Sequence, residues 1–142
     1  MITLASAQAI ITAALAHARA SALKPLAVVV LDAGGHAVAL AREDGASFGR
    51  ETIARAKAHG ALAMGDDTAA IAERAKGNPV FYASLVGVFD GGLALSPGGM
   101  LVRDGDGAVI GAVGISGDTG PADATAAIAG IVAAGFAAGA TA

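Results

Sequence analysis

Apolar residues recur at helical spacing near the start of the chain. Leu4, Ile11 and Leu15 fall on one face of a helix. Thr3 precedes them, and its hydroxyl is suited to accept a hydrogen bond from the first turn. This pattern predicts a helix over residues 4–23.

The next segments follow an extended pattern. Residues 26–31 are rich in β-branched side chains, and residues 36–42 alternate larger and smaller ones. Between them lies the pair Gly34-Gly35, which is typical of a tight turn because glycine adopts positive φ angles without steric cost. We therefore expect an antiparallel hairpin.

The rest of the chain alternates between helical and extended patterns. It predicts helices over residues 47–64, 68–76 and 119–138, and strands over residues 84–89, 93–96, 100–103 and 108–116. Because hairpins make most of the strand connections, the sheet should be mainly antiparallel. The prediction is an α+β fold, in which a single layer of mainly antiparallel sheet is flanked by helices, as one domain over residues 1–142.

Composition adds an expectation about assembly. The chain is 55% hydrophobic and 15% charged, whereas an average soluble domain is about 25% charged. This balance excludes intrinsic disorder, which needs low hydrophobicity and high charge. A surface with so few charges favours burial between subunits. We therefore expect a homo-oligomer.

Charge, cysteine content and the two chain ends narrow the classes of partner. The net charge is −3, and the nine Lys and Arg residues are scattered, which is not the pattern of a nucleic-acid-binding protein. The chain has no cysteine and no closely paired histidines, so neither a disulfide nor a metal site is predicted. The start lacks the basic residues of a signal peptide, and residues 124–142 are mostly Ala and Gly. We expect a cytoplasmic protein with no membrane partner.

Two of the three histidines are candidate cofactor ligands. His17 and His59 lie within predicted helices. Either imidazole could bind haem iron, since one neutral ring is enough, or either could be a partly exposed histidine with no ligand. His36 begins a strand beside the hairpin turn, where a solvated side chain is expected.

A few cations are placed where they could bind an anion. Lys57 falls in an otherwise apolar helical stripe, so it either extends towards solvent or neutralises an anionic group of the protein or of a ligand. Arg42 ends a predicted strand, where it can clamp a carboxylate or pair at the surface with Asp44 or Glu43.

Two glycine loops and one carboxylate complete the candidate site. The pairs Gly98-Gly99 and Ser116-Gly117 let backbone N–H groups approach a ligand. The second pair precedes a predicted helix, and helix starts favour anions. Asp123 in that helix is either a partner of the helix dipole or a functional carboxylate.

Taken together, these segments resemble the GlcG/HbpS-like family. The resemblance covers nearly the whole chain, and it is carried by residues 28–35, residues 41–45, Lys57-Ala58, Thr68, Pro97-Gly98-Gly99, residues 107–117 and Asp123. It implies an α+β domain that assembles into oligomers, often octamers. Members of the family include haem-binding proteins, the C-terminal domain of PduO-type corrinoid adenosyltransferases, and small accessory proteins encoded among bacterial catabolic genes.

The sequence is compatible with two functions, one of which is catalytic and one of which is not. The first is an oligomer that binds haem or a small anionic metabolite. Its haem ligand would be His17 or His59, and its ligand-binding residues would be Arg42, Lys57, Gly98, Gly99, Ser116 and Gly117.

The second function is a small catabolic enzyme of the isomerase, lyase or hydrolase type. It would act on a metabolite with a carboxylate or carbonyl group, which Arg42 and Lys57 would bind. Such reactions require a proton transfer, and the candidate catalytic residues for it are Asp44, His59 and Asp123.

Overall fold

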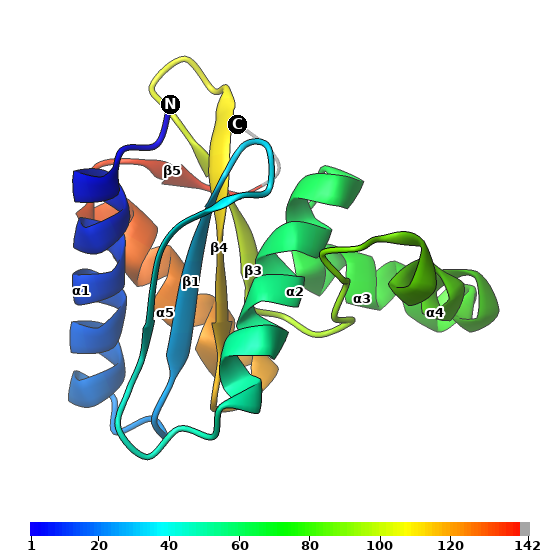
Figure 1. Cartoon of the computed structure of the whole chain (residues 1–142), viewed down its shortest axis with the longest axis horizontal. Helices are drawn as coiled ribbons and strands as arrows, with labels where there is room; N and C mark the ends of the chain where they lie inside the picture. Colours follow the sequence, from blue (N-terminus) through cyan, green and yellow to red (C-terminus); the bar gives the residue numbers. More distant parts are fainter. Residues whose placement is uncertain (140–142) are drawn as a thin grey trace.

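The computed structural model describes residues 1–139, and within them five helices and five strands form an α+β fold (Figure 1). The predicted fold class is confirmed. In chain order the elements are α1 (Leu4–Ala20), β1 (Ala27–Asp32), β2 (Ala37–Arg42), α2 (Gly49–Met64), α3 (Thr68–Gly77), α4 (Pro79–Val88), β3 (Gly99–Arg103), β4 (Val109–Ser116), α5 (Gly120–Ala133) and β5 (Ala137–Ala138).

The strands form one sheet in the order β2-β1-β4-β3-β5, and each neighbouring pair is antiparallel. Helices α1 and α5 cover one face of the sheet, and α2 covers the other (Figure 1). The helices α3 and α4 extend from the α2 side, away from the sheet. The sheet is therefore the middle of three layers.

The central strand β1 shows why the apolar run at its position is continuous. Val28 and Val30 pack towards α1 and α5, whereas Val29 and Leu31 pack towards α2. Successive side chains of a strand point to opposite faces, so a strand covered on both sides needs apolar residues at every position. This part of the predicted hairpin is confirmed.

Small residues bring α2 very close to the sheet. Ala54 and Ala58 of α2 are fully buried above β4. At Gly114 of β4, an added Cβ atom would collide with the backbone carbonyl of Ala54. The many Ala and Gly residues thus allow close packing of helix against sheet, and they also leave the surface with few charged side chains.

The prediction of strands over residues 84–89 and 93–96 is wrong. Helix α4 occupies Pro79–Val88, and residues 93–96 form no strand. Pro79 is well placed in the first turn of a helix. The apolar residues that follow lie on every side of α4, so they carry no helical period that would distinguish them from a strand.

The last predicted helix is also too long. Helix α5 ends at Ala133, and Gly135 follows with φ of 90°, a left-handed conformation that commonly terminates helices. The chain then pairs with β3 through β5. The other predicted elements are confirmed, with bounds that differ by up to three residues.

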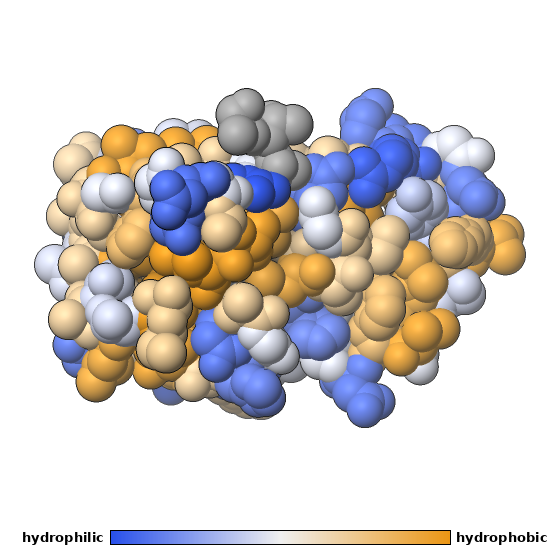
Figure 2. Space-filling model, turned by 90° about the horizontal axis from the view of Figure 1, so that it is seen from above, coloured by the Kyte–Doolittle hydropathy of each residue, from blue (hydrophilic) through white to orange (hydrophobic). Residues whose placement is uncertain are grey.

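Helix α4 is the least covered element of the fold. None of its residues is buried, and Val80 and Val88 are 82% and 65% exposed. Figure 2 shows apolar atoms gathered at the end of the molecule where α4 lies. Among the described residues, no helix combines the length and the hydropathy that a bilayer-spanning segment needs.

Candidate functional site

A buried ion pair joins α2 to the start of α5. The Lys57 Nζ atom lies 3.0 Å from Asp123 Oδ2, and the two side chains are 3% and 1% exposed. Lys57 Nζ also donates a hydrogen bond to the backbone carbonyl of Ile115 (2.8 Å) at the end of β4. The other Asp123 oxygen, Oδ1, accepts from the backbone N–H of Asp118 (3.0 Å). The structure thus supplies Lys57 with an anion from the protein itself.

The surroundings of Lys57 disfavour its charged form. Burial lowers the pKa of Lys57 below its ordinary value of 10.5, while the Asp123 carboxylate acts in the opposite direction. The nearby positive charge of Arg50 also lowers the pKa of Lys57. Asp123 therefore provides the main electrostatic support for a positive charge at this position.

The Gly98-Gly99 loop closes over the ion pair. Gly98 has φ of 124°, and a Cβ atom there would lie 2.9 Å from Lys57 Nζ. Gly99 donates its backbone N–H to the hydroxyl of the buried Thr68 (2.8 Å). A side chain at either glycine would displace Lys57 or its helix, so this loop packs directly against the pair.

The Ser116-Gly117 pair lies next to the ion pair and borders a separate surface hollow. Ser116 Oγ accepts a hydrogen bond from the guanidinium of Arg50 (3.3 Å). Gly117 packs against the backbone carbonyl of Pro25. The hollow measures about 250 Å³ and is lined by Lys24, Pro25, Gly45, Ala46, Ser47, Arg50 and Gly117; we call it the Arg50 pocket.

Arg50 is not among the residues predicted from the sequence. This residue is the second in α2, where the positive end of the helix dipole makes a cation unfavourable. A positive side chain in a first helical turn is therefore a signal that the residue serves something other than helix stability.

Arg42 and Asp44 lie at the same end of the sheet but apart from the ion pair. Ala27 of β1 pairs with Arg42 on one side and with Ser116 on the other. The exposed Arg42 side chain donates to the backbone carbonyl of Ala46 (2.6 Å), and Asp44 is exposed in the same loop. The structure thus brings together six of the predicted residues, which are Lys57, Gly98, Gly99, Ser116, Gly117 and Asp123.

His59 lies towards the other end of α2, against the hairpin turn. Its Nδ1 atom is 2.9 Å from the backbone carbonyl of Gly92, and a Cβ atom at Gly91 would collide with the ring. Phe89 contacts the ring edge-on, with centroids 6.2 Å apart. A carbonyl can only accept a hydrogen bond, so the neutral ring carries its proton on Nδ1 and a lone pair on Nε2.

A hollow of about 160 Å³ adjoins the His59 ring. It is lined by Ala33, Gly34, Gly35, His59, Leu62 and Ala63. Apart from His59 itself, these are small or apolar residues. Among the predicted residues, His59 is the one whose side chain combines a fixed orientation with an adjoining hollow.

The other two histidines lie in different settings. His17 is half-buried on α1, and within the described residues its ring forms no hydrogen bond. The His36 side chain is 80% exposed, as expected, and its Nδ1 atom lies 3.3 Å from Asp32 Oδ1.

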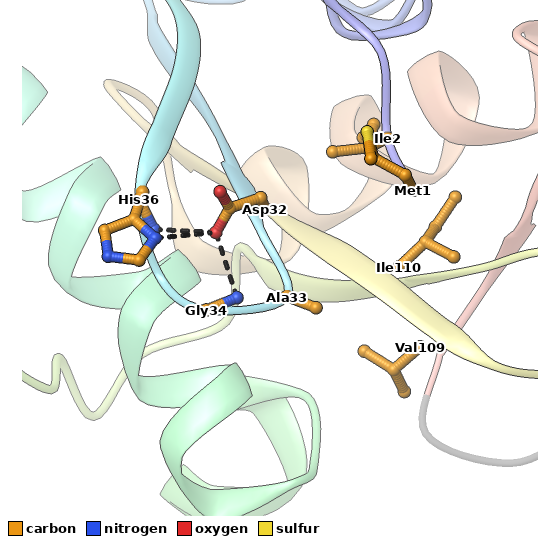
Figure 3. Close-up of a pocket in the computed structure, with 8 residues that line it drawn as sticks. All are labelled: Met1, Ile2, Asp32, Ala33, Gly34, His36, Val109 and Ile110. Carbon is orange, nitrogen blue, oxygen red and sulfur yellow. Dashed lines mark hydrogen bonds and ion pairs between the residues drawn. The ribbon is translucent and has the colours of Figure 1, made fainter.

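A further hollow of about 310 Å³ lies beside the β1–β2 turn (Figure 3). On one side the Asp32 carboxylate accepts hydrogen bonds from the backbone N–H groups of His36 and Gly34, which hold the pKa of Asp32 below its ordinary value. Ile2 and Ile110 form an apolar wall on the other side. Asp32 is thus engaged in holding the turn.

The comparisons with known proteins identify the class of this α+β chain. The model of the HbpS-like family, described as haem degrading protein HbpS-like, matches residues 2–132. The chain therefore belongs to the HbpS-like family, as the sequence resemblance predicts. A search of curated proteins finds no significant match.

Solved structures of similar proteins share the whole fold. A crystal structure of a PduOC:heme complex has a TM-score of 0.84 and 25% identity, with 96% of each chain covered. The crystal structure of HbpS has a TM-score of 0.80 and 26% identity, and covers 92% of this chain and 88% of its own. The Klebsiella pneumoniae protein ORFY, of family-model DUF336, has a TM-score of 0.83 and 27% identity over 94% of this chain and 90% of its own.

Proposed function

We propose that this protein binds haem and that His59 ligates the iron. The family model is described as haem degrading protein HbpS-like, and one solved structure with the same fold is a haem complex. The observation that carries the assignment to His59 is the hydrogen bond between its Nδ1 atom and the Gly92 carbonyl. Histidines that ligate metals commonly donate their second ring N–H in this way, which fixes the ring and directs Nε2 to the metal.

The surroundings of His59 fit an iron ligand better than those of His17. The hollow beside the ring is lined by the Gly34-Gly35 turn, Leu62 and Ala63, and Phe89 adds an aromatic edge. When bound, haem supplies a redox-active iron. The residues of this chain fix the imidazole and select the tautomer whose lone pair is on Nε2.

Binding of haem by this chain also favours an assembly. The hollow at His59, about 160 Å³, is smaller than the space a ligand of drug size occupies, so only part of a macrocycle could enter it. A neighbouring copy would cover the rest. We propose a homo-oligomer, an octamer as the resemblance implies, in which the exposed apolar side chains of α4 are buried between copies.

Haem titration of purified protein tests the assignment. We expect a saturable Soret shift for the wild type and its loss in His59→Ala. The matched controls His17→Ala and His36→Ala should keep it, and circular dichroism would check the fold of every variant. Haem binding that survives in His59→Ala but not in His17→Ala would move the ligand to α1, and the absence of binding by the wild type would overturn the proposal.

Light scattering tests the assembly separately. We expect Val80→Glu and Val88→Glu to lower the mass of the particle, because each places a charge on the apolar surface of α4. Thr12→Glu on the exposed side of α1 is the control and should leave the mass unchanged. A wild-type protein with the mass of one chain would refute the assembly.

Catalysis on a small carboxylate or carbonyl compound stays a prediction. The groups assigned to it have partners within the protein, since Lys57 is paired with Asp123 and Arg42 donates to the Ala46 carbonyl. These contacts count against Arg42 and Lys57 as the groups that would bind such a compound.

A further inference from the structure

The Arg50 pocket contains a positive charge that the fold does not neutralise. Within the described residues, the Arg50 guanidinium forms one hydrogen bond, to the uncharged hydroxyl of Ser116, at 3.3 Å. Lys24 lines the same hollow, and its ammonium group forms no ion pair within residues 1–139. Two cations therefore border a hollow of about 250 Å³ in a protein whose net charge is −3.

The carboxylates near this pocket have partners within the fold. Asp123 is paired with Lys57, and Glu43 is paired with Arg19 (3.0 Å). Asp118 accepts hydrogen bonds from the backbone N–H groups of Lys24 and Thr119, and its charge also interacts with that of Lys24. Of the two positive side chains that line the pocket, Arg50 forms no ion pair with a carboxylate of residues 1–139.

The positive charge of Arg50 does not favour the stability of the fold. It lies in the first turn of α2, where its charge opposes the helix dipole. It also repels Lys57 closely enough to contribute to the lowered pKa of that group. A neutral side chain would avoid both effects, so the charge at this position indicates a partner outside the chain.

We propose that the Arg50 pocket binds a small oxyanion, a carboxylate or a phosphate. The guanidinium matches such groups with two parallel N–H donors. Lys24 adds a second charge, and Ser47 belongs to the same lining. A volume of about 250 Å³ corresponds to roughly eight water molecules, which admits a small metabolite and excludes a porphyrin. This site is distinct from the haem site at His59, and its occupancy does not depend on haem.

Two-dimensional NMR of ¹⁵N-labelled protein tests the site directly, with acetate and inorganic phosphate as probes and acetamide as the neutral analogue of acetate. We expect saturable shifts of the amides of Gly45, Ser47 and Gly117 with at least one of the two anions, and none with acetamide. Comparison of the two anions identifies whether the pocket prefers a carboxylate or a phosphate.

Variants separate this site from its surroundings. Arg50→Gln should weaken anion binding about tenfold, the loss of one charge-assisted pair of hydrogen bonds, and Arg50→Lys should keep part of the affinity. Arg55→Gln is the control on the same helix, because Arg55 is already paired with Glu51 (2.7 Å). His59→Ala should leave anion binding unchanged, so a failure of the haem proposal would be distinguishable from a failure of this one. Equal shifts with acetamide, the absence of saturable binding, or undiminished binding by Arg50→Gln would overturn the proposal.

Discussion

Two positive side chains of α2 meet adjacent residues of β4 and have opposite surroundings. Lys57 donates to the carbonyl of Ile115 and to the carboxylate of Asp123, and it is almost fully buried. Arg50 donates to the hydroxyl of Ser116 and lines an open hollow. A cation that the sequence suggests as a ligand-binding group is therefore available to a ligand only when no carboxylate of the fold is already paired with it.

The same criterion applies to the backbone around each cation. The Lys57 cluster, which we define as Lys57, Thr68, Gly98, Gly99 and Asp123, is buried, and its polar side chains have partners within the chain. The Arg50 pocket is bordered by loop residues that are mostly exposed or half-buried. We therefore expect substitutions in the cluster to change stability and substitutions in the pocket to change binding.

The largest effect should come from breaking the buried ion pair. Lys57→Met leaves the Asp123 carboxylate buried without its counter-charge, which should lower the free energy of unfolding by about 3–5 kcal/mol. Urea denaturation measures the change. The control is Lys76→Met, which breaks the exposed pair of Lys76 with Glu73 (2.7 Å) and should cost less than about 1 kcal/mol. Equal losses in the two variants would show that the burial of Lys57 has no energetic consequence.

A smaller loss should follow from removing one hydrogen-bond acceptor of the cluster. Thr68→Val keeps the shape of the side chain but leaves the buried N–H of Gly99 without its hydroxyl partner, which should cost about 1–3 kcal/mol. Thr12→Val on the exposed side of α1 is the matched control and should be nearly neutral. If both variants unfold at the same urea concentration, the Thr68 hydroxyl does not support the Gly98-Gly99 loop.

Local features of this fold could be predicted from the sequence, whereas contacts between distant residues could not. The hairpin at Gly34-Gly35 was predictable because its turn chemistry is contained in neighbouring residues. The partner of Lys57 lies 66 residues further along the chain, and the carbonyl that orients His59 lies 33 residues away. No local sequence pattern shows which residues that far apart will be in contact. Lys57 and His59 could therefore be named as candidates, but their partners could not.

The error at α4 has a different physical cause. Periodicity reports a helix only when one side is apolar and the other polar. Helix α4 carries apolar residues on all sides and no charge, and none of its residues is buried within the chain. An element that has no buried side within its own chain therefore lacks the pattern on which the prediction depends. The family resemblance, in contrast, reached the fold because it used the whole chain at once.

The pocket should respond little in stability. Arg50→Gln removes one long hydrogen bond and a charge that opposes the helix dipole, so we expect a change of less than about 0.5 kcal/mol in either direction. Urea denaturation in the absence of added anions measures it. Added phosphate or acetate should stabilise the wild type more than Arg50→Gln if ligand binding is linked to folding. A large loss of stability in Arg50→Gln without added anion would show that Arg50 stabilises the fold, as the residues of the Lys57 cluster do.

The smallest effect concerns Asp118, which connects the two regions. Its carboxylate accepts the backbone N–H groups of Lys24 and Thr119, and these hydrogen bonds hold the pKa of Asp118 below its ordinary value of 3.8. Because the pKa is lower in the folded chain than in the unfolded chain, this carboxylate contributes stability above about pH 4. That contribution is lost as the pH falls through the folded pKa.

Asp118→Asn should therefore lower stability slightly at pH 7, and the difference from the wild type should shrink as the pH falls below 4. Thermal unfolding at a series of pH values measures both curves. Asp106→Asn is the control, since the Asp106 carboxylate accepts no hydrogen bond within the described residues and lies on an exposed turn. A constant difference between Asp118→Asn and the wild type across this range would show that the carboxylate charge does not hold the Lys24 backbone. The Arg50 pocket would then owe the placement of Lys24 to Pro25 and its neighbours rather than to Asp118.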